Sequence, residues 1–194
     1  MAHWGMTSLP IGVRETVTDP LDTDTSTDIT VRQMIGIVRQ SITALPIANV
    51  IHTCLQTLPR DPSQRRLARC FYQWIQQHVV FVEDEMMLSR MLGWRGRLDK
   101  ELLIYPEVVV SMPHPMGDCD DLSMLLATLL IAVGIKCWFV VIAADTMVPG
   151  KWSHVYVKCA LEDEGVVLPL DVSHGDQIGW EYNGTVYRRM EYAI

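Results

Sequence analysis

The sequence is short of positive charge. Its 194 residues include 16 Lys and Arg against 23 Asp and Glu, so the formal net charge is -7 at pH 7. A protein that binds nucleic acid needs clustered Lys and Arg to neutralise phosphates. The densest basic group, Arg65, Arg66 and Arg69, is small and is typical of the solvated face of a helix. We therefore expect no nucleic-acid partner.

Cysteine is also sparse, and no two cysteines form a CxxC pair. The five cysteines are widely spaced, at Cys54, Cys70, Cys119, Cys137 and Cys159. This pattern predicts neither a disulfide framework nor a zinc knuckle. We expect a reducing compartment such as the cytoplasm, and neither a metal ion nor a cofactor.

The sequence lacks a secretory signal and an uninterrupted membrane span. The first 20 residues have no apolar core of the length that a signal needs. The apolar run Leu122–Ala144 is long enough to cross a bilayer as one helix. However, Gly134 and Lys136 interrupt it, and the residues that follow are aromatic and β-branched. The run predicts a buried helix followed by a buried strand.

The composition is that of a globular protein with one core. Hydrophobic residues make up 49% of the chain, which is enough to bury a sizeable core at this length. Residues 1–28 are rich in Thr, Asp and Pro and have no periodicity, so they are expected to form an extended or disordered arm. Residues 29–60 are expected to form a helical extension, and residues 61–194 the main domain.

Helical spacing dominates the first part of the chain, and strand-like alternation dominates the second. Helices are expected over residues 31–44, 47–58, 62–78 and 83–92, and a central helix from Cys119 to about residue 133 is apolar almost all round. Strands are expected over residues 79–82, 136–143, 154–160, 166–170 and 185–189. This order predicts an α+β fold with helices packed on one face of a mostly antiparallel sheet.

Cys119 is the candidate nucleophile. A cysteine thiol is largely protonated at neutral pH, so a nucleophilic cysteine needs a neighbour that lowers its pKa or removes its proton. Cys119 is expected in the first turn of the central helix, where backbone amides and the helix dipole favour a thiolate and can hold an oxyanion. The other four cysteines are expected inside helices and strands, as small buried hydrophobic residues.

His154 is the candidate base, and Asp171 is the candidate group that orients it. His154 stands at the entrance of the predicted strand 154–160. A lone histidine in a strand is more often a hydrogen-bonded core residue than a base. However, Asp171 ends the apolar run 166–170, where a carboxylate can accept a hydrogen bond from the imidazole and fix its tautomer.

These residues resemble the transglutaminase-like branch of the papain-like cysteine enzymes. The run Gly117–Ile135, which begins GDCDDL, resembles the cysteine block of the family, Trp152–Val157 its histidine strand and Val167–Asp171 its aspartate strand. The resemblance covers residues 62–182 and keeps the order of the family, with gaps of 35 and 17 residues between the three candidate side chains. It implies a papain-like core in which the helix that bears the cysteine packs on the sheet.

A finer likeness is to the small transglutaminase-like proteins of tailed phages and prophages. These proteins carry GDCDD, a His-Val-Tyr-Val strand and a late Gly-Trp-Glu, which is Gly179–Glu181 here. The family commonly has Pro-Thr after the aspartate, whereas this chain has Val172–His174. That departure leaves His174 as a competing imidazole, and His114, five residues before the cysteine, is another.

The resemblance implies acyl transfer on a protein or peptide substrate. The thiolate attacks an amide carbonyl and forms a thioester, which is released to water or to an amine. Hydrolysis and transamidation share the first half of this reaction, and both stay open. Asp118, Asp120 and Asp121 are expected to act mainly as helix caps and positioning groups.

Two alternatives also stay open. The chain could be a structural head or tail component of a phage that keeps the fold and acts as an assembly or interaction protein through its N-terminal arm. It would then be found in the host-cell cytoplasm or in the virion. Alternatively, Cys119, His154 and Asp171 could ligate a zinc ion, as in catalytic sites with three protein ligands.

Overall fold

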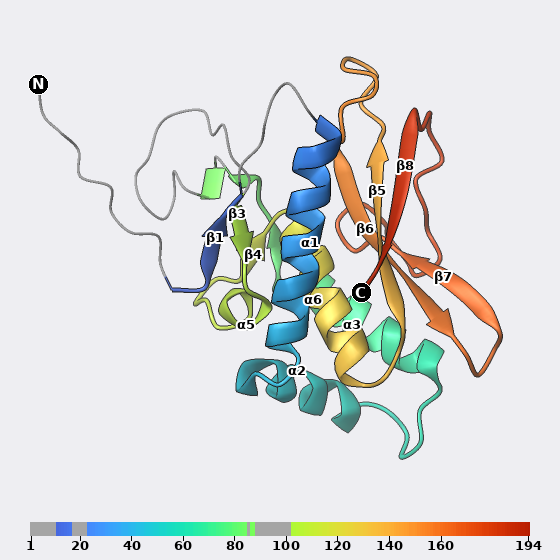
Figure 1. The fold of residues 1–194 in the computed structure, drawn as a ribbon. Helices are drawn as coiled ribbons and strands as arrows, with labels where there is room; N and C mark the ends of the chain where they lie inside the picture. The colour runs from blue at the N-terminus through green and yellow to red at the C-terminus, as the bar shows by residue number, and fades with distance from the viewer. Residues whose placement is uncertain (1–10, 17–22, 85, 88–101) are drawn as a thin grey trace, which may run out of the picture.

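Helices and a four-stranded sheet form two layers in the computed structural model, which describes residues 11–16, 23–84, 86–87 and 102–194. The main helices lie on one side of this sheet (Figure 1). The chain is therefore α+β, as the sequence predicted.

The first helix, α1 (Thr23–Ser41), begins eight residues before its predicted start and ends three residues before its predicted end. Distant residues hold its first turn. Asp24 accepts hydrogen bonds from Trp152 Nε1 at 3.0 Å and from Arg188 Nη2 at 2.6 Å. An acid in the first turn also suits the helix dipole. The expectation that residues 23–28 are extended was wrong, because local composition does not reveal contacts with residues so far along the chain.

A second part of the expected arm is a strand. Strand β1 (Val13–Glu15) pairs in antiparallel fashion with β3 (Leu102–Ile104). The hydroxyl oxygens of Thr16 and Thr30 lie 3.0 Å apart and connect β1 to α1. The remainder of the arm, residues 1–10 and 17–22, lies outside the described residues.

The next two helices were predicted to within two residues at each end. They are α2 (Leu45–Gln56) and α3 (Gln64–His78). Pro46 lies in the first turn of α2, where its fixed φ suits a helix and its missing N–H costs nothing. Ser63 is the N-cap residue of α3, and its Oγ accepts a hydrogen bond from the Arg66 amide at 3.4 Å.

Short elements lie between α3 and the central helix. They are β2 (Val80–Phe81), α5 (Pro106–Val109) and β4 (Met116–Gly117). Strand β2, which was predicted, pairs in parallel with β4, which was not. Most of the helix predicted over residues 83–92 lies outside the described residues. Of the described part, residues 84, 86 and 87 are helical and residue 83 is not.

The central helix, α6 (Cys119–Ala132), is buried along nearly its whole length. Every residue from Asp120 to Leu130 is buried. The helix ends before Gly134, whose φ of 80° lies in the left-handed region that favours glycine. A strand follows, so the prediction of a helix and then a strand in this apolar run is confirmed. Within the described residues, no helix by itself has the length and hydropathy of a membrane span, although α1 and α2, joined at a sharp bend, do so together.

The main sheet is antiparallel, as predicted, with the order β7-β6-β5-β8. Its strands are β5 (Cys137–Ala143), β6 (His154–Leu161), β7 (Val166–Leu170) and β8 (Arg188–Ala193). The first three match the predictions to within one residue. The prediction for the last strand, residues 185–189, was wrong by several residues, because pairing with β5 fixes the strand and the β-branched residues 185 and 186 precede that ladder.

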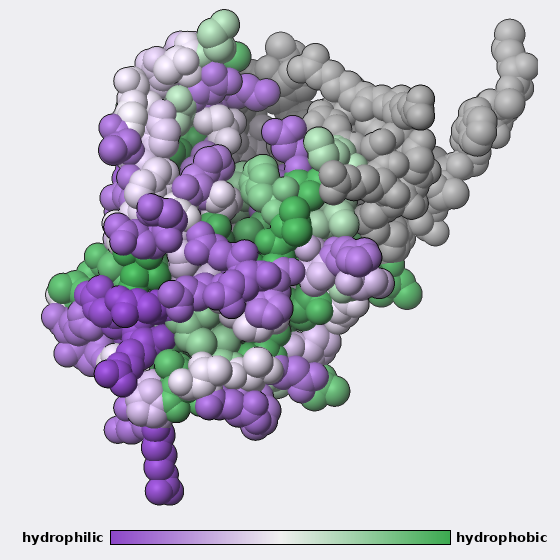
Figure 2. Space-filling model, turned by 180° about the vertical axis from the view of Figure 1, so that it is seen from behind, coloured by the Kyte–Doolittle hydropathy of each residue, from purple (hydrophilic) through white to green (hydrophobic). Residues whose placement is uncertain are grey.

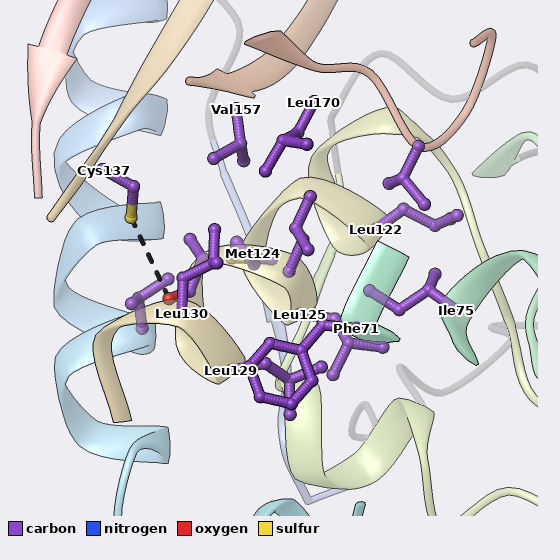
Figure 3. Close-up of a cluster of buried hydrophobic side chains, with 14 of the residues drawn as sticks. Phe71, Ile75, Leu122, Met124, Leu125, Leu129, Leu130, Cys137, Val157 and Leu170 are labelled. Carbon is purple, nitrogen blue, oxygen red and sulfur yellow. Dashed lines mark hydrogen bonds between the residues drawn. The ribbon is translucent and has the colours of Figure 1, made fainter. Parts of the chain in front are cut away.

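The core holds α6 between α3 and the sheet. In the buried cluster of Figure 3, Leu125 and Leu129 of α6 lie toward Phe71 of α3, and Val157 and Leu170 come from β6 and β7. Burial of one such side chain contributes about 1.5–3 kcal/mol. The helix that carries Cys119 is therefore a rigid part of the core.

The same buried cluster includes the N-terminal helices. Met34 of α1 and Ile47 of α2 belong to it together with Leu125 and Val157. The division into an arm (1–28), a helical extension (29–60) and a main domain (61–194) stays a prediction.

Some large apolar side chains reach the surface. Seen from behind, polar residues cover much of the described surface and hydrophobic residues appear in smaller patches (Figure 2). Val80 and Phe81 are both exposed, as are Val166 and Val167 at the start of β7. Strand β2 thus presents apolar side chains to solvent beside β4, the segment that leads to Cys119.

Replacement of Leu125 tests the central position of α6. Leu125 is fully buried, so Leu125→Ala should lower the free energy of unfolding by about 2–5 kcal/mol, as measured by urea denaturation. Leu45→Ala is the matched control, because Leu45 is 73% exposed and its removal should change stability by only about 0.5 kcal/mol. Equal losses in the two variants would contradict this account of the core.

Candidate active site

Cys119 is the first residue of α6 and is partly exposed. The parallel pairing of β4 with β2 fixes the segment that leads to it. Asp118 is the N-cap residue, with an extended backbone, and its carbonyl accepts a hydrogen bond from the Leu122 amide at 3.0 Å. The first amides of a helix have no acceptor within the helix and attract negative charge. The thiol therefore lies at the positive end of α6.

The glycine of the GDCDD motif allows this segment to approach α6 closely. A Cβ atom on Gly117 would lie 2.7 Å from Cβ of Asp121, which is closer than real side chains come. Gly117 is buried and needs no unusual backbone angle. Its role is therefore to permit contact between the backbone of β4 and the first turn of α6.

His154 and Asp171 form a buried hydrogen-bonded pair. His154 Nε2 lies 2.7 Å from Asp171 Oδ2, and the two side chains are 10% and 1% exposed. His154 is the first residue of β6, and Asp171 directly follows β7. A proton on Nε2, directed at the carboxylate, leaves Nδ1 as the proton acceptor of the ring.

The other carboxylate oxygen of Asp171 is held by the turn that follows it. Asp171 Oδ1 accepts hydrogen bonds from the Ser173 amide at 3.2 Å, the Ser173 hydroxyl at 2.9 Å and the His174 amide at 3.0 Å. Two side chains of α3 also hold this turn. The Tyr72 hydroxyl donates to the Asp171 carbonyl at 3.0 Å. Gln76 Nε2 donates to the Gly175 carbonyl at 2.7 Å. The carboxylate is thus fixed on both sides.

Sequence reasoning missed Ser173, Tyr72 and Gln76 as supporting residues. An aspartate followed two residues later by serine is a known signature of a side-chain-bonded turn, so Ser173 had a usable signal. Tyr72 and Gln76 had none, because they lie about 100 positions before their partners and only the tertiary fold brings them together.

The surroundings of Asp171 keep it ionised. Burial acts to raise the pKa of Asp171, but the hydrogen bond from His154, together with those from Ser173 and the His174 amide, outweighs burial and lowers the pKa below its ordinary value. A charged carboxylate orients the imidazole and stabilises it when it takes up a proton.

A hydrogen bond connects the start of α6 to the start of β6. The Ser123 hydroxyl donates to the Val155 carbonyl at 3.1 Å. Strand β7 pairs with β6 only as far as Val157, which stands opposite Leu170. Val155 therefore belongs to the part of β6 that β7 does not pair with. Cys119 precedes Ser123 by one helical turn and therefore shares its face of α6. The hydrogen bond of Ser123 therefore brings the first turns of α6 close to the start of β6, the strand that His154 begins.

Of the two competing imidazoles, His174 lies directly beside the buried pair. Its ring centroid is 4.5 Å from that of His154, in an edge-on arrangement, and Phe81 makes an edge contact with His174 at 5.9 Å. Burial and the charge of His154 lower the pKa of His174. His114 is exposed in the loop that precedes β4.

The acids around Cys119 were expected to act mainly as helix caps and positioning groups. Asp121 does both, because its carboxylate accepts hydrogen bonds from the backbone amides of Asp118 and Ile104. The side chain of Asp118 makes no cap hydrogen bond, and Asp121 Oδ1 accepts from the Ile104 amide at 2.8 Å, which positions β3. Burial and the nearby charge of Asp118 raise the pKa values of Asp120 and Asp121 well above the ordinary range. Burial of these two carboxyl groups therefore lowers the stability of the folded chain.

Three groups of side chains near α6 and β6 have the spacing of metal ligands, and one of them is Asp118, Cys119 and Asp120. Oxygen atoms of Asp84, Asp118 and Asp121 lie within 4.8 Å of one another, a set suited to a hard divalent cation. His154, Asp171 and His174 form the third group, with the same spacing.

Burial disfavours the thiolate form of three of the other cysteines. Burial raises the pKa values of Cys137 and Cys159 to about 12 and that of Cys54 further. Cys70 is half-buried, and its Sγ lies 3.7 Å from the Cys54 carbonyl oxygen. These surroundings agree with the expectation that all four are structural.

Comparison of the chain with protein-family models and with curated proteins gives no match. The family resemblance and the catalytic roles of Cys119, His154 and Asp171 therefore stay predictions. The geometry of the described residues is what supports them.

Substitution of Gly175 tests the support of Asp171. A Cβ atom at Gly175 would lie 2.6 Å from the Asp171 carbonyl oxygen and 2.8 Å from the Tyr72 hydroxyl, so the turn must shift. Gly175→Ala should cost about 1–3 kcal/mol of stability in thermal or urea unfolding. Gly36→Ala is the matched control: no atom lies within 4 Å of its added Cβ, and alanine in a helix should stabilise by up to about 1 kcal/mol. A neutral or stabilising Gly175→Ala would contradict the close packing of this turn.

Replacement of Asp120 tests the cost of the buried acids. A carboxyl whose pKa is raised by folding stabilises the folded chain below its unfolded pKa, and this contribution is lost as pH rises through the folded pKa. An asparagine at position 120 does not titrate. The free energy of unfolding of Asp120→Asn, minus that of wild type, should therefore increase as pH rises from about 4 to about 8. Urea denaturation with a chelator present measures this. Asp61→Asn, which removes an exposed carboxylate, is the control, and an equal pH trend in both variants would count against the assignment.

Proposed function

We propose that the chain is a cysteine-dependent acyl-transfer enzyme of the transglutaminase-like, papain-like kind, acting on an amide bond of a protein or peptide. The observation that supports it most is the buried hydrogen bond between His154 and Asp171 at the entrance of β6, where α6 packs through Ser123. A thiol at a helix N terminus, an imidazole and a carboxylate are the parts that this chemistry needs. The papain-like arrangement of helix and sheet is part of the proposal.

In the proposed reaction, Nδ1 of His154 takes the proton of the Cys119 thiol. Asp171 keeps the other ring nitrogen protonated and stabilises the imidazolium that forms. The thiolate then attacks the amide carbonyl of the substrate, and the backbone amides at the start of α6 stabilise the oxyanion. The imidazolium returns its proton to the leaving amine, which departs and leaves a thioester on Cys119.

The thioester is then released to water or to an amine. His154 removes a proton from the incoming nucleophile, and Cys119 leaves as the thiol. The Cys119 thiol is partly exposed, as the proposed attack on a substrate requires.

Alkylation of Cys119 by iodoacetamide at neutral pH tests the proposal. Mass spectrometry should find Cys119 modified first, and His154→Ala should slow the modification about 100-fold or more, because the proton acceptor is lost. Asp171→Asn, which keeps the shape of the side chain, should also slow it. A peptide amide substrate should then show turnover that needs all three residues.

The matched control is Cys70→Ser, which removes a half-buried thiol and should leave the rate at Cys119 unchanged. Melting temperatures of all variants establish that they are folded. Modification of Cys119 at the same rate in wild type and His154→Ala would sink the enzyme proposal. That result would favour a structural or assembly role for the fold.

A further inference from the structure

His174 places a second imidazole beside the pair formed by His154 and Asp171. Each of the three residues offers a ligand atom, and these atoms all lie within 4.8 Å of one another. The three residues come from the start of β6 and from the turn after β7. In the proposed reaction the side chains of His154 and Asp171 act on the proton, whereas the imidazole of His174 takes no part.

The donor set is that of a transition-metal site. Two imidazoles and one carboxylate, with a fourth position left open, are typical ligands of Zn²⁺ in sites that also bind water or substrate. We propose that His154, Asp171 and His174 bind Zn²⁺ or a cation of the same class, and that the bound metal blocks the base of the proposed reaction.

The site needs little rearrangement. Zinc bonds of about 2.0–2.1 Å in a tetrahedron place the ligand atoms about 3.3 Å apart. His154 and Asp171 already lie closer than this, at 2.7 Å. His174 must move toward them, and its side chain is 55% exposed, so it can rotate without disturbing the core.

Hydrogen bonds around the site would support a bound metal. The Ser173 hydroxyl and the His174 amide hold Asp171 Oδ1, and the Ser173 hydroxyl lies 3.1 Å from His174 Nδ1. Such outer hydrogen bonds orient ligands and raise affinity.

Metal binding would stop the proposed reaction for a simple reason. A neutral imidazole has one lone pair, which can hold either a proton or a metal. Zinc on either ring nitrogen of His154 therefore removes the proton acceptor that Cys119 needs. The inhibition depends on the proposed function, whereas the binding does not.

Titration with Co²⁺, a coloured substitute for Zn²⁺, tests the binding directly. The wild-type chain should bind one Co²⁺ with the intense visible absorption of a low-coordinate site, and Zn²⁺ should displace it. His174→Ala should weaken binding about tenfold or more, because it removes a ligand. His52→Ala is the matched control, since His52 is exposed on α2 and bonds to Gln56, and it should bind like wild type.

Each outcome bears on the proposal separately from the proposed function. Equal affinity in wild type and His174→Ala, or no absorption at all, would overturn the metal site even if Cys119 reacts rapidly. Metal binding that is present in the wild-type chain and lost in His174→Ala would uphold the metal site even if Cys119 proves unreactive. If Cys119 is reactive, Zn²⁺ should slow its alkylation in wild type and His52→Ala but much less in His174→Ala.

Discussion

The hydrogen bond between His154 and Asp171 is the interaction on which the site depends. A buried carboxylate is costly unless donors replace its water, and Asp171 receives four of them, one from His154 and three from the turn that follows it. These donors need β6, β7 and α3 in place together. The fold therefore determines the position and the charge of the pair before any ligand arrives.

Local signals predicted most of the large elements. Helical spacing predicted α2 and α3 to within two residues at each end, Gly134 marks the end of α6, and alternation in the second half predicted β5 to β7. The elements that were missed depend on distant partners. Strands β1 and β4 are three and two residues long, and only their pairing with β3 and β2 makes them strands.

The site was predictable to the extent that its residues share a motif. GDCDD at a helix start, a histidine at a strand entrance and an aspartate after a strand could all be found in the chain. What a sequence could not reveal is which neighbours act on these groups. Asp121 was expected near a cap and also holds the Ile104 amide of β3, and the contact between the rings of His174 and Phe81 joins segments more than 90 positions apart.

The first turn of α1 has partners that lie far along the chain. Asp24 bonds to Trp152 in the connection between β5 and β6 and to Arg188, which is 164 positions away and lies over the Trp152 ring. A chain emerging from the ribosome makes α1 well before β8, so the first turn of α1 gains these partners only after β5, β6 and the start of β8 have been synthesised.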